Sequence, residues 1–396
     1  MPETEPSPTI LLLDHTGELG GAERVLLELT EDAASAGFRT LVACSGGALR
    51  TRLIAQGTET WELRLGEALR TVSREVWRQS PWRVLWQARE LGLEAWRLAA
   101  RAREAQVTLI QTNTLKAHIL GALVARLAGL PLVWHMHDMP SSRGDTRRLL
   151  QVAALIRRPR GILAVSQAAA SDLPLDLQSL VRVVHNGIDL SAFDAAAAQS
   201  RPCEAWPEAP ARVVGAVSWL IPWKGLDVLI TAFASLSPRH PDLRLVIVGD
   251  TIFQWREERQ RLEHLARALG LTERVVFLGA REDVPSLLRR MDLFVHPSRF
   301  EPFGRVLLEA MAAERAVVAC AAGGVPEVVA ADVSGLLVPP GEAEPLAAAI
   351  ETLLADPQRA AQLGRAGRLR AAQHFSLAST RQAVYAAWRS WCKDQA

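Results

Sequence analysis

The stretch from Met291 to Ala313 constrains the fold of this chain more than any other part of it. Apolar residues run from Met291 to His296, as in a buried strand, and helical spacing follows from Gly304. A strand that passes through a tight loop into a helix is typical of parallel α/β sheets, where ligands collect beyond the carboxyl ends of the strands. The unpaired N–H groups of Phe303, Gly304 and Arg305 would suit a phosphate there.

Two carboxylates flank this expected helix start. Glu301 lies in the loop, and Glu309 lies in the second turn, at roughly 1.5 Å of rise per residue further along. Two separated acids with phosphate-binding N–H groups between them suit a sugar–diphosphate–ribose. Taken alone, such a pair is more often an ordinary loop acid and an acid on a helix surface.

Chain length and charge narrow the class of protein. With 396 residues, the chain is too long for one ordinary core and predicts two domains, which we place at residues 1–195 and 196–375. Apolar residues make up 49% and charged residues 22%, as in globular proteins. A formal net charge of +2 argues against a nucleic-acid binder with a dense basic surface.

The cysteines and the chain start indicate a reducing compartment. The four cysteines are scattered, with neither a C-x-x-C motif nor histidines at metal-ligand spacing, which predicts no zinc site and no disulfide framework. Residues 1–8 are acidic and proline-rich, unlike a signal peptide, and no run of about 20 apolar residues is present. We expect a cytoplasmic protein.

Alternating strands and helices are predicted on both sides of an alanine- and proline-rich linker at residues 192–211. Predicted helices begin near Ala22, run from Lys116 to Ala128 and form an amphipathic tail from Leu377 to Trp391. The predicted strands are 9–13, 39–44, 107–111, 132–134, 161–165 and 181–184 before the linker, and 212–217, 243–248, 275–278, 291–296, 316–319 and 336–338 after it.

Tryptophans and arginines gather in the first half. A helical region at residues 69–105 contains Trp77, Trp82, Trp86 and Trp96, each close to an arginine. We favour packing in a core or between domains for these tryptophans, and contact with an anionic membrane is the alternative. An arginine run at 143–160 is by default a solvated helix face, and attraction of an anionic acceptor such as a lipid phosphate is its alternative.

Six short segments, taken together and in order, resemble one family. They are Gly20-Gly21-Ala22-Glu23-Arg24, Trp134-His135-Met136-His137-Asp138, His185-Asn186-Gly187-Ile188-Asp189, Pro222-Trp223-Lys224-Gly225, Glu301-Pro302-Phe303-Gly304 with Glu309-Ala310-Met311-Ala312, and Gly323-Gly324-Val325-Pro326-Glu327. The set resembles the retaining glycosyltransferases of family 4. The resemblance implies the α/β fold called GT-B, two Rossmann-like domains facing across a cleft, with a C-terminal helix at 376–396 returning to the first domain.

In the first domain, the resemblance points to donor-facing, sugar-contacting and acceptor-binding positions. Gly20 and Gly21 would face the donor phosphates or the acceptor. His137 would contact the transferred sugar, whereas we interpret His135 as structural. The loops that vary most in the family would bind the acceptor, here Asn113, Lys116 and residues 139–148.

In the second domain, the resemblance describes a donor site. Lys224 is a point charge for the diphosphate, together with the N–H groups of Gly304 and Arg305. Glu309 would bind the ribose, and Glu301 would bind hydroxyls of the sugar. The loop at Gly249-Asp250 would lie near the nucleotide, and Phe303 belongs to the donor-binding loop.

One position departs from the family. An arginine usually stands five residues before the lysine, and here that residue is Trp219. Its loss removes a charge-assisted contact that is typically worth about 1.5–3 kcal/mol. Replacement by Arg299 or Arg305 is an alternative that the sequence leaves open.

The predicted activity is transfer of a hexose-type sugar, with retention, from a UDP-, GDP- or ADP-sugar to an acceptor hydroxyl. We expect no metal or other cofactor, no nucleic-acid partner, and a cytoplasmic location with the inner membrane face as an alternative. Two rivals are a related phosphorylase or epimerase and a binding protein without turnover. The sequence indicates neither the acceptor nor the oligomeric state.

Overall fold

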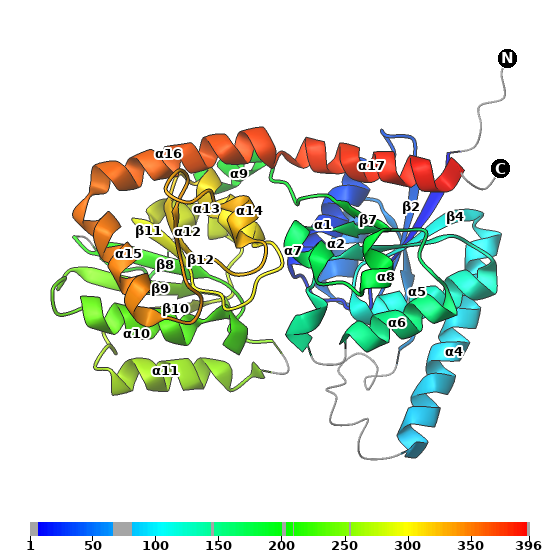
Figure 1. The fold of residues 1–396 in the computed structure, drawn as a ribbon, viewed down its shortest axis with the longest axis horizontal. Helices are drawn as coiled ribbons and strands as arrows, with labels where there is room; N and C mark the ends of the chain where they lie inside the picture. Colours follow the sequence, from blue (N-terminus) through cyan, green and yellow to red (C-terminus); the bar gives the residue numbers. More distant parts are fainter. Residues whose placement is uncertain are drawn as a thin grey trace. The chain divides into compact units, whose positions relative to one another are not determined.

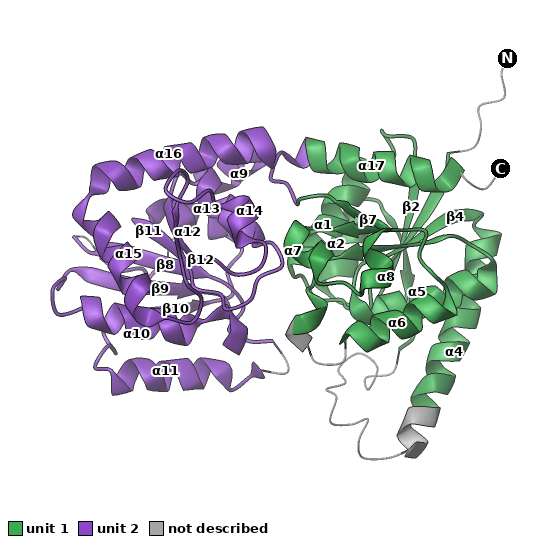
Figure 2. Ribbon diagram, in the orientation of Figure 1, with its two compact units in different colours: residues 1–185, 379–396 green, residues 186–378 purple. Residues whose placement is uncertain are grey.

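The computed structural model describes residues 7–65, 81–143, 146–199, 203–208, 210–252 and 255–393 (Figure 1). The chain forms two compact units (Figure 2). Unit 1 comprises residues 1–185 and 379–396, and unit 2 comprises residues 186–378. The boundary between residues 185 and 186 lies earlier in the chain than the one we place at 195.

A helix explains this difference. Helix α9 (Leu190–Ala198) lies in residues that we predicted as linker and packs on α12 (Val284–Arg290) of unit 2. Asp189 caps α9, because its carboxylate accepts hydrogen bonds from the N–H groups of Ser191 (2.9 Å) and Ala192 (3.0 Å). The linker prediction is therefore wrong for residues 192–198, where alanine-rich composition concealed a capped helix.

Unit 1 is built on a parallel sheet of seven strands in the order β3-β2-β1-β4-β5-β6-β7. The strands are β1 (Thr9–Leu13), β2 (Arg39–Cys44), β3 (Glu59–Glu62), β4 (Val107–Thr112), β5 (Leu132–Met136), β6 (Gly161–Ala164) and β7 (Val181–Val183). In the central register, Leu11 pairs with Leu41 of β2 on one side and Ile110 of β4 on the other. The strand order reverses between β1 and β4, and their carboxyl ends form the switch point.

Helices cover both faces of this sheet because its strands are apolar on both sides. Ile10 and Leu12 face the cluster that contains α1 (Gly21–Glu31), α2 (Ala48–Ala55) and part of α17 (Leu377–Lys393). Leu11 and Leu13 face α4 (Pro81–Glu104), α5 (Leu115–Ala128) and α6 (Thr146–Ile156). The short helices η2 (Pro140–Arg143), α7 (Gln167–Ser171) and α8 (Leu175–Gln178) complete the unit.

The C-terminal helix α17 joins the core of unit 1, as predicted. Trp388 is fully buried and packs edge-on against Phe38, with ring centroids 5.3 Å apart. The hydroxyl of Tyr385 donates to Leu29 O at 2.8 Å. Near the C-terminal end of α17, a Cβ atom on Gly161 would lie 2.1 Å from the ring of Trp391, so only glycine fits there.

Unit 2 is built on a parallel sheet of six strands in the order β10-β9-β8-β11-β12-β13. The strands are β8 (Arg212–Val217), β9 (Leu243–Val248), β10 (Val275–Gly279), β11 (Leu293–His296), β12 (Ala316–Cys320) and β13 (Leu336–Val338). One face packs on α10 (Leu226–Leu236), α11 (Glu258–Ala268) and α15 (Ala343–Ala355). The other elements are η3 (Pro222–Lys224), α13 (Arg305–Ala312), α14 (Val325–Val328) and α16 (Pro357–His374). Here the order reverses between β8 and β11.

Two expectations for the first half change. Strand β5 continues through His135 and Met136, which we predicted to leave its end. Trp86 and Trp96 are 59% and 67% exposed, so the prediction that they pack in a core is wrong. Trp77 and the side chain of Trp82 lie outside the described residues. None of the described helices has the length and the apolar character needed to cross a membrane.

Candidate functional site

The loops that follow β8 and β11 are joined at the switch point of unit 2. Arg299 N donates to Trp223 O at 2.9 Å. Gly225 has a φ of +67°, and a Cβ atom on it would lie 2.1 Å from Pro297 O. Only glycine satisfies both conditions, because an L side chain is strained at this φ and would also collide with the loop. The glycine thus brings its neighbour Lys224 to the carboxyl edge of the sheet.

Lys224 forms an ion pair with Glu301 at this edge. Lys224 Nζ donates to Glu301 Oε2 at 2.6 Å, and His296 Nε2 lies 3.0 Å from the same oxygen. Ser298 Oγ lies 3.4 Å from it. Burial raises the pKa of Glu301, but the Lys224 charge and the hydrogen bonds from His296 and Lys224 outweigh it and hold this pKa well below its ordinary value. Glu301 is therefore ionised at neutral pH.

The start of α13 is held next to this pair. Gly304, with a φ of +87°, is the residue before α13, and a Cβ atom on it would lie 2.7 Å from Leu307 Cδ1. Gly324 N donates to Glu301 O at 2.9 Å and ties the loop after β12 to the same place. Phe303 is buried and packs on Phe375, with ring centroids 5.9 Å apart, so its side chain supports the loop.

The other predicted donor residues of unit 2 lie on neighbouring elements. Arg305 and Glu309 lie in the first and second turns of α13, both half-buried. Gly249 has a φ of +134°, and a Cβ atom on it would lie 1.9 Å from Ser218 O. Leu220 N donates to Asp250 O at 3.0 Å. The loop after β9 is therefore attached to the loop that contains Lys224.

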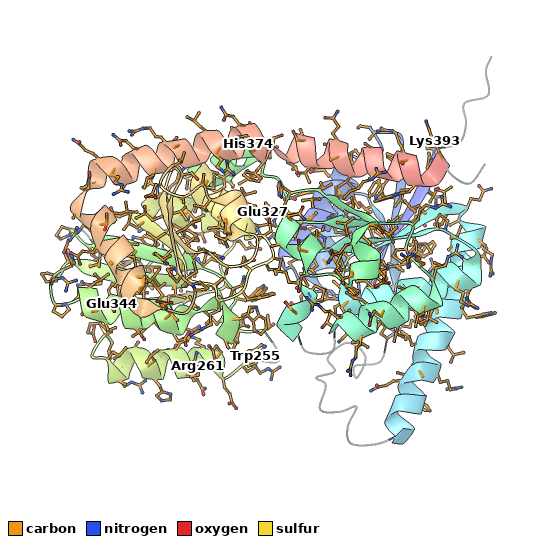
Figure 3. The ribbon with its side chains drawn as sticks, viewed as in Figure 1. Trp255, Arg261, Glu327, Glu344, His374 and Lys393 are labelled. Carbon is orange, nitrogen blue, oxygen red and sulfur yellow. The ribbon has the colours of Figure 1, made fainter. Side chains whose placement is uncertain are left out.

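Arg299 is paired with a carboxylate of the protein. The alternative in which Arg299 replaces the missing family arginine would instead require it to bind the diphosphate. Its guanidinium donates to both carboxylate oxygens of Asp227, at 2.7 and 2.9 Å, and to Pro222 O. This bidentate pair braces the loop and speaks against Arg299 as a replacement for the arginine missing at Trp219. In η3, after β8, Trp223 packs edge-on against Trp255, labelled in Figure 3, with ring centroids 5.7 Å apart.

In unit 1, the loops after β1 and β4 meet in the same way. His15 Nδ1 lies 2.7 Å from Thr114 Oγ1, and Asn113 N donates to Leu13 O at 3.1 Å. Asn113 and His137 line one hollow of unit 1, together with Thr114, Met136 and Asp138. The structure thus brings a predicted acceptor-side residue next to the predicted catalytic histidine.

The remaining predicted residues of unit 1 lie at helix starts. Gly20 precedes α1, and its N–H donates to Glu23 Oε2 at 2.9 Å. Gly21 is the first residue of α1, and Lys116 lies in the first turn of α5. His135 is buried beside this edge, and burial lowers its pKa to about 3, so it is neutral at physiological pH, as suits a structural residue.

Two known family profiles match this chain, one in each half. Residues 19–192 match the profile described as Glycosyltransferase Family 4, and residues 205–370 match Glycosyl transferases group 1. A lipopolysaccharide core biosynthesis mannosyltransferase, LpcC of Rhizobium leguminosarum bv. viciae, is 30% identical over 336 residues, which cover 84% of this chain and 90% of that protein. The chain belongs to glycosyltransferase family 4. A D-inositol 3-phosphate glycosyltransferase of Segniliparus rotundus is 31% identical, over 76% of this glycosyltransferase and 68% of that protein.

A solved structure confirms the predicted fold class. Anabaena HepE, solved in complex with UDP-glucose, is 30% identical with a TM-score of 0.81, over 96% of this chain and 99% of that one. The glycosyltransferase therefore has the GT-B fold, with two parallel-sheet α/β units. Among the described residues, no three His, Cys, Asp or Glu side chains are grouped so that they could hold a metal ion.

Our sequence analysis missed a polar chain in unit 1 of this glycosyltransferase. Trp388 Nε1 donates to Gln111 Oε1 at 2.7 Å, and Gln111 Nε2 donates to Asn113 Oδ1 at 3.1 Å. The same Gln111 nitrogen lies 3.5 Å from His135 Nδ1, and the rings of His135 and His137 are 4.1 Å apart. The one available signal was a glutamine inside the apolar strand β4, because a buried amide needs partners.

Four further side chains near the two edges were also missed. His296 and Ser298 contact Glu301, and their signal was polar residues at the carboxyl end of a buried strand. Asp14 and Glu23 are buried near the start of α1. Burial, with a smaller contribution from neighbouring acids, raises the pKa of both.

Proposed function

We propose that this glycosyltransferase moves a hexose-type sugar from a nucleotide-diphospho-sugar to an acceptor hydroxyl and retains the anomeric configuration. The observation that supports it best is the Lys224–Glu301 ion pair at the switch point of unit 2, beside the start of α13. A cation, a carboxylate and helix N–H groups at one edge suit a diphosphate joined to a sugar. The HepE complexes with UDP and UDP-glucose make a uridine nucleotide the first donor to test.

In this proposal, unit 2 binds the leaving group. An ammonium group has three donors, and Lys224 uses one of them on Glu301. The others, with the N–H groups of Gly304 and Arg305, would bind the diphosphate and stabilise its growing negative charge as the glycosidic bond breaks. Glu301 would accept hydrogen bonds from hydroxyls of the sugar, and Glu309 from those of the ribose.

Unit 1 supplies the remaining roles. His137 would contact the transferred sugar, and Asn113 and Lys116 would bind the acceptor. Gly20 and Gly21 would allow a close approach of backbone to substrate. Retention implies that the acceptor hydroxyl attacks from the face that the diphosphate leaves, and that the departing phosphate oxygen takes the hydroxyl proton. This scheme uses no metal or other cofactor.

The nucleotide would lie beside Gly249 and Asp250, and the acceptor is proposed by chemical class. The relative LpcC is described as acting in lipopolysaccharide core synthesis, which supports a cell-surface glycan or a glycolipid as acceptor. The same relative is a mannosyltransferase, so mannose is the second sugar to test after glucose. We propose the cytoplasm as the location.

A thermal-shift screen of UDP-, GDP- and ADP-sugars tests donor binding, because a ligand that binds only the folded protein raises its apparent stability. The stabilising donor is then incubated with candidate acceptors, and the product's anomeric configuration is read by NMR. Sugar transfer with retention supports the proposal. Phosphorolysis or donor isomerisation would assign another reaction class.

The Glu301→Ala variant separates turnover from binding. We expect it to lose transfer and donor hydrolysis, whereas wild type retains both. Donor binding with no turnover in the wild-type protein would identify an inert binding module. The tryptophan at position 219, where the family usually has an arginine, would explain such a loss of turnover.

A further inference from the structure

Helix α4 turns large apolar side chains toward solvent. Trp86, Leu93 and Trp96 are 59%, 54% and 67% exposed. Their spacing of seven and three residues places them along one face of the helix. The guanidinium of Arg89 lies over the Trp86 ring, 5.6 Å from its centroid, on the same side of α4.

The inward face of α4 places small and aliphatic side chains in the core of unit 1, together with the buried polar side chains of Gln87 and Glu94. Glu94 is 4% exposed, and its carboxylate accepts hydrogen bonds from Arg97 Nε (2.8 Å) and Arg64 N (2.9 Å). Trp96, two residues later, is 67% exposed. A helix that buries a carboxylate and exposes tryptophan carries an apolar surface beyond what its own core requires, which is typical of an interaction site.

The neighbouring helices extend this surface. Helix α4 packs on α5 and α5 on α6, and all three cover the same face of the unit 1 sheet (Figure 1). Exposed apolar side chains continue across them, with Leu127 on α5 (44%) and Val152 and Leu155 on α6 (48% and 84%). We call these three side chains, together with Trp86, Leu93 and Trp96, the α4–α6 surface.

Basic side chains outnumber acidic ones on the helices of the α4–α6 surface. Helices α5 and α6 contain Lys116, Arg126, Arg147 and Arg148 but no aspartate or glutamate, and Arg147 is paired with Asp172. On α4, Glu90 accepts a hydrogen bond from Trp86 Nε1 at 2.9 Å. Arg126 and Arg157 bind backbone carbonyls near the helix ends, those of Ile156 and Leu130, and these neutral acceptors leave the arginine charges uncancelled. The surface therefore attracts an anionic partner.

We propose that the α4–α6 surface lies on an anionic lipid bilayer. The tryptophans and leucines would enter the boundary between headgroups and acyl chains, and the arginines would bind lipid phosphates. A bilayer is favoured over an acidic protein because the apolar side chains stand apart on three helices among arginines, whereas a protein interface concentrates them in a central cluster. This inference rests on the surface alone and does not require the proposed donor chemistry.

Co-sedimentation with lipid vesicles tests this surface in the full chain. The vesicles contain phosphatidylcholine with or without phosphatidylglycerol. Wild type should bind the anionic vesicles, and the Trp86→Ser/Trp96→Ser variant should bind them at least roughly tenfold more weakly, because two large apolar groups no longer enter the lipid. The matched apolar control is Leu369→Ser on α16 of unit 2, where Leu369 is 62% exposed, and it should bind like wild type.

A second pair of variants tests the charge. Arg148→Gln on α6 should weaken binding to anionic vesicles by about fivefold, as expected for one arginine at a charged membrane surface. The effect should shrink at high salt. Arg365→Gln, an exposed arginine on α16, should leave binding unchanged.

Three outcomes would overturn the proposal. They are no binding of wild type to anionic vesicles, equal losses in the α4–α6 and control variants, and a wild-type dimer that Trp96→Ser converts to a monomer without any change in vesicle binding. The last would assign the surface to a second copy of the chain. Thermal unfolding of each variant and its response to a stabilising nucleotide-sugar distinguish these outcomes from misfolding and from failure of the donor proposal.

Discussion

The two units place polar groups at the same topological position but in opposite electrostatic states. In unit 2, the carboxylate of Glu301 has Lys224 Nζ at 2.6 Å, and its pKa is lowered despite burial. In unit 1, Asp14 Oδ1 lies 3.9 Å from His15 Nδ1, and burial raises the pKa of Asp14. A nearby cation therefore decides whether a buried acid at a sheet edge keeps its charge.

This electrostatic difference fits the two binding roles proposed for the units. A charged, hydrogen-bonded site suits an anionic diphosphate, whereas the amide groups of Gln111 and Asn113 beside the neutral His135 suit hydroxyl groups. In unit 2 the charged side chains bind one another, and in unit 1 the buried amide of Gln111 connects α17 to the site. Substitutions on each side test this contrast.

The largest expected effect is that of Lys224→Met. Loss of the ammonium group should lower kcat of sugar transfer about 100-fold or more, as for removal of one preorganised donor to a developing negative charge. Steady-state kinetics with the donor found in the thermal-shift screen measure it. Lys393→Met, an exposed lysine of α17 labelled in Figure 3, is the control and should leave kcat unchanged.

The same substitution tests the ion pair itself. Removal of one partner of a buried pair typically destabilises a protein by about 3–5 kcal/mol, because the other charge stays buried without compensation. Lys224→Met/Glu301→Gln should therefore be less destabilised than the sum of the single variants, as urea unfolding measures. Additive losses would mean that the two charges do not stabilise each other in solution.

A smaller effect is expected in unit 1 from Trp388→Phe. This variant leaves the buried Gln111 Oε1 without its donor, which should cost about 1–3 kcal/mol of folding free energy. Trp391→Phe, in the same helix, keeps the Trp388–Gln111 bond and should lose less in the same urea titration. Trp388→Phe/Gln111→Met removes both partners and should recover part of the loss.

The sequence predicted the parts of the glycosyltransferase that local pattern determines. Strands 9–13, 39–44 and 212–217 have the predicted bounds, because each is a short apolar run between polar loops. Lys224 and Glu301 are in contact, although 77 residues separate them, because parallel strands bring their carboxyl ends to one edge. Family resemblance added the positions of Asn113 and His137, which line one hollow.

Tertiary context determined what the sequence did not predict. Gln111 and Trp388 are 277 residues apart, and no local pattern relates them. Strand β3, Glu59–Glu62, alternates charged and partly apolar residues at a sheet edge and lacks the apolar run that marks the central strands. Trp86 and Trp96 are exposed because the face of α4 that packs on the core is the one that contains Ala95, Leu98 and Ala102.

The next prediction adds a charge to unit 2. Trp219→Arg restores the cation that the family usually has, and a charge-assisted contact should tighten donor binding about tenfold. Isothermal titration with the stabilising nucleotide-sugar measures the change. Trp219→Leu removes the ring without adding charge and should not tighten binding. Equal affinities of the arginine and leucine variants would show that residue 219 does not reach the diphosphate.

The last test is a pH dependence of opposite sign in the two units. The folded-state pKa of Asp14 is raised above its ordinary 3.8, so this carboxyl opposes folding increasingly as pH rises from there. Asp14→Asn should therefore be at least as stable as wild type at neutral pH, and any advantage should vanish as pH falls toward 3.8. Its amide oxygen can still accept the bond from Thr16 N.

Glu301→Gln in unit 2 should show the opposite pH dependence of stability relative to wild type. The folded-state pKa of Glu301 is lowered from 4.5, so the carboxylate contributes stability that is present above 4.5 and is lost as pH falls through the folded-state pKa. The variant should be less stable than wild type at neutral pH, with the gap narrowing in acid. Urea unfolding of both variants across this pH range measures the two slopes. Slopes of the same sign would mean that Asp14 keeps its charge and that the electrostatic contrast between the units does not exist.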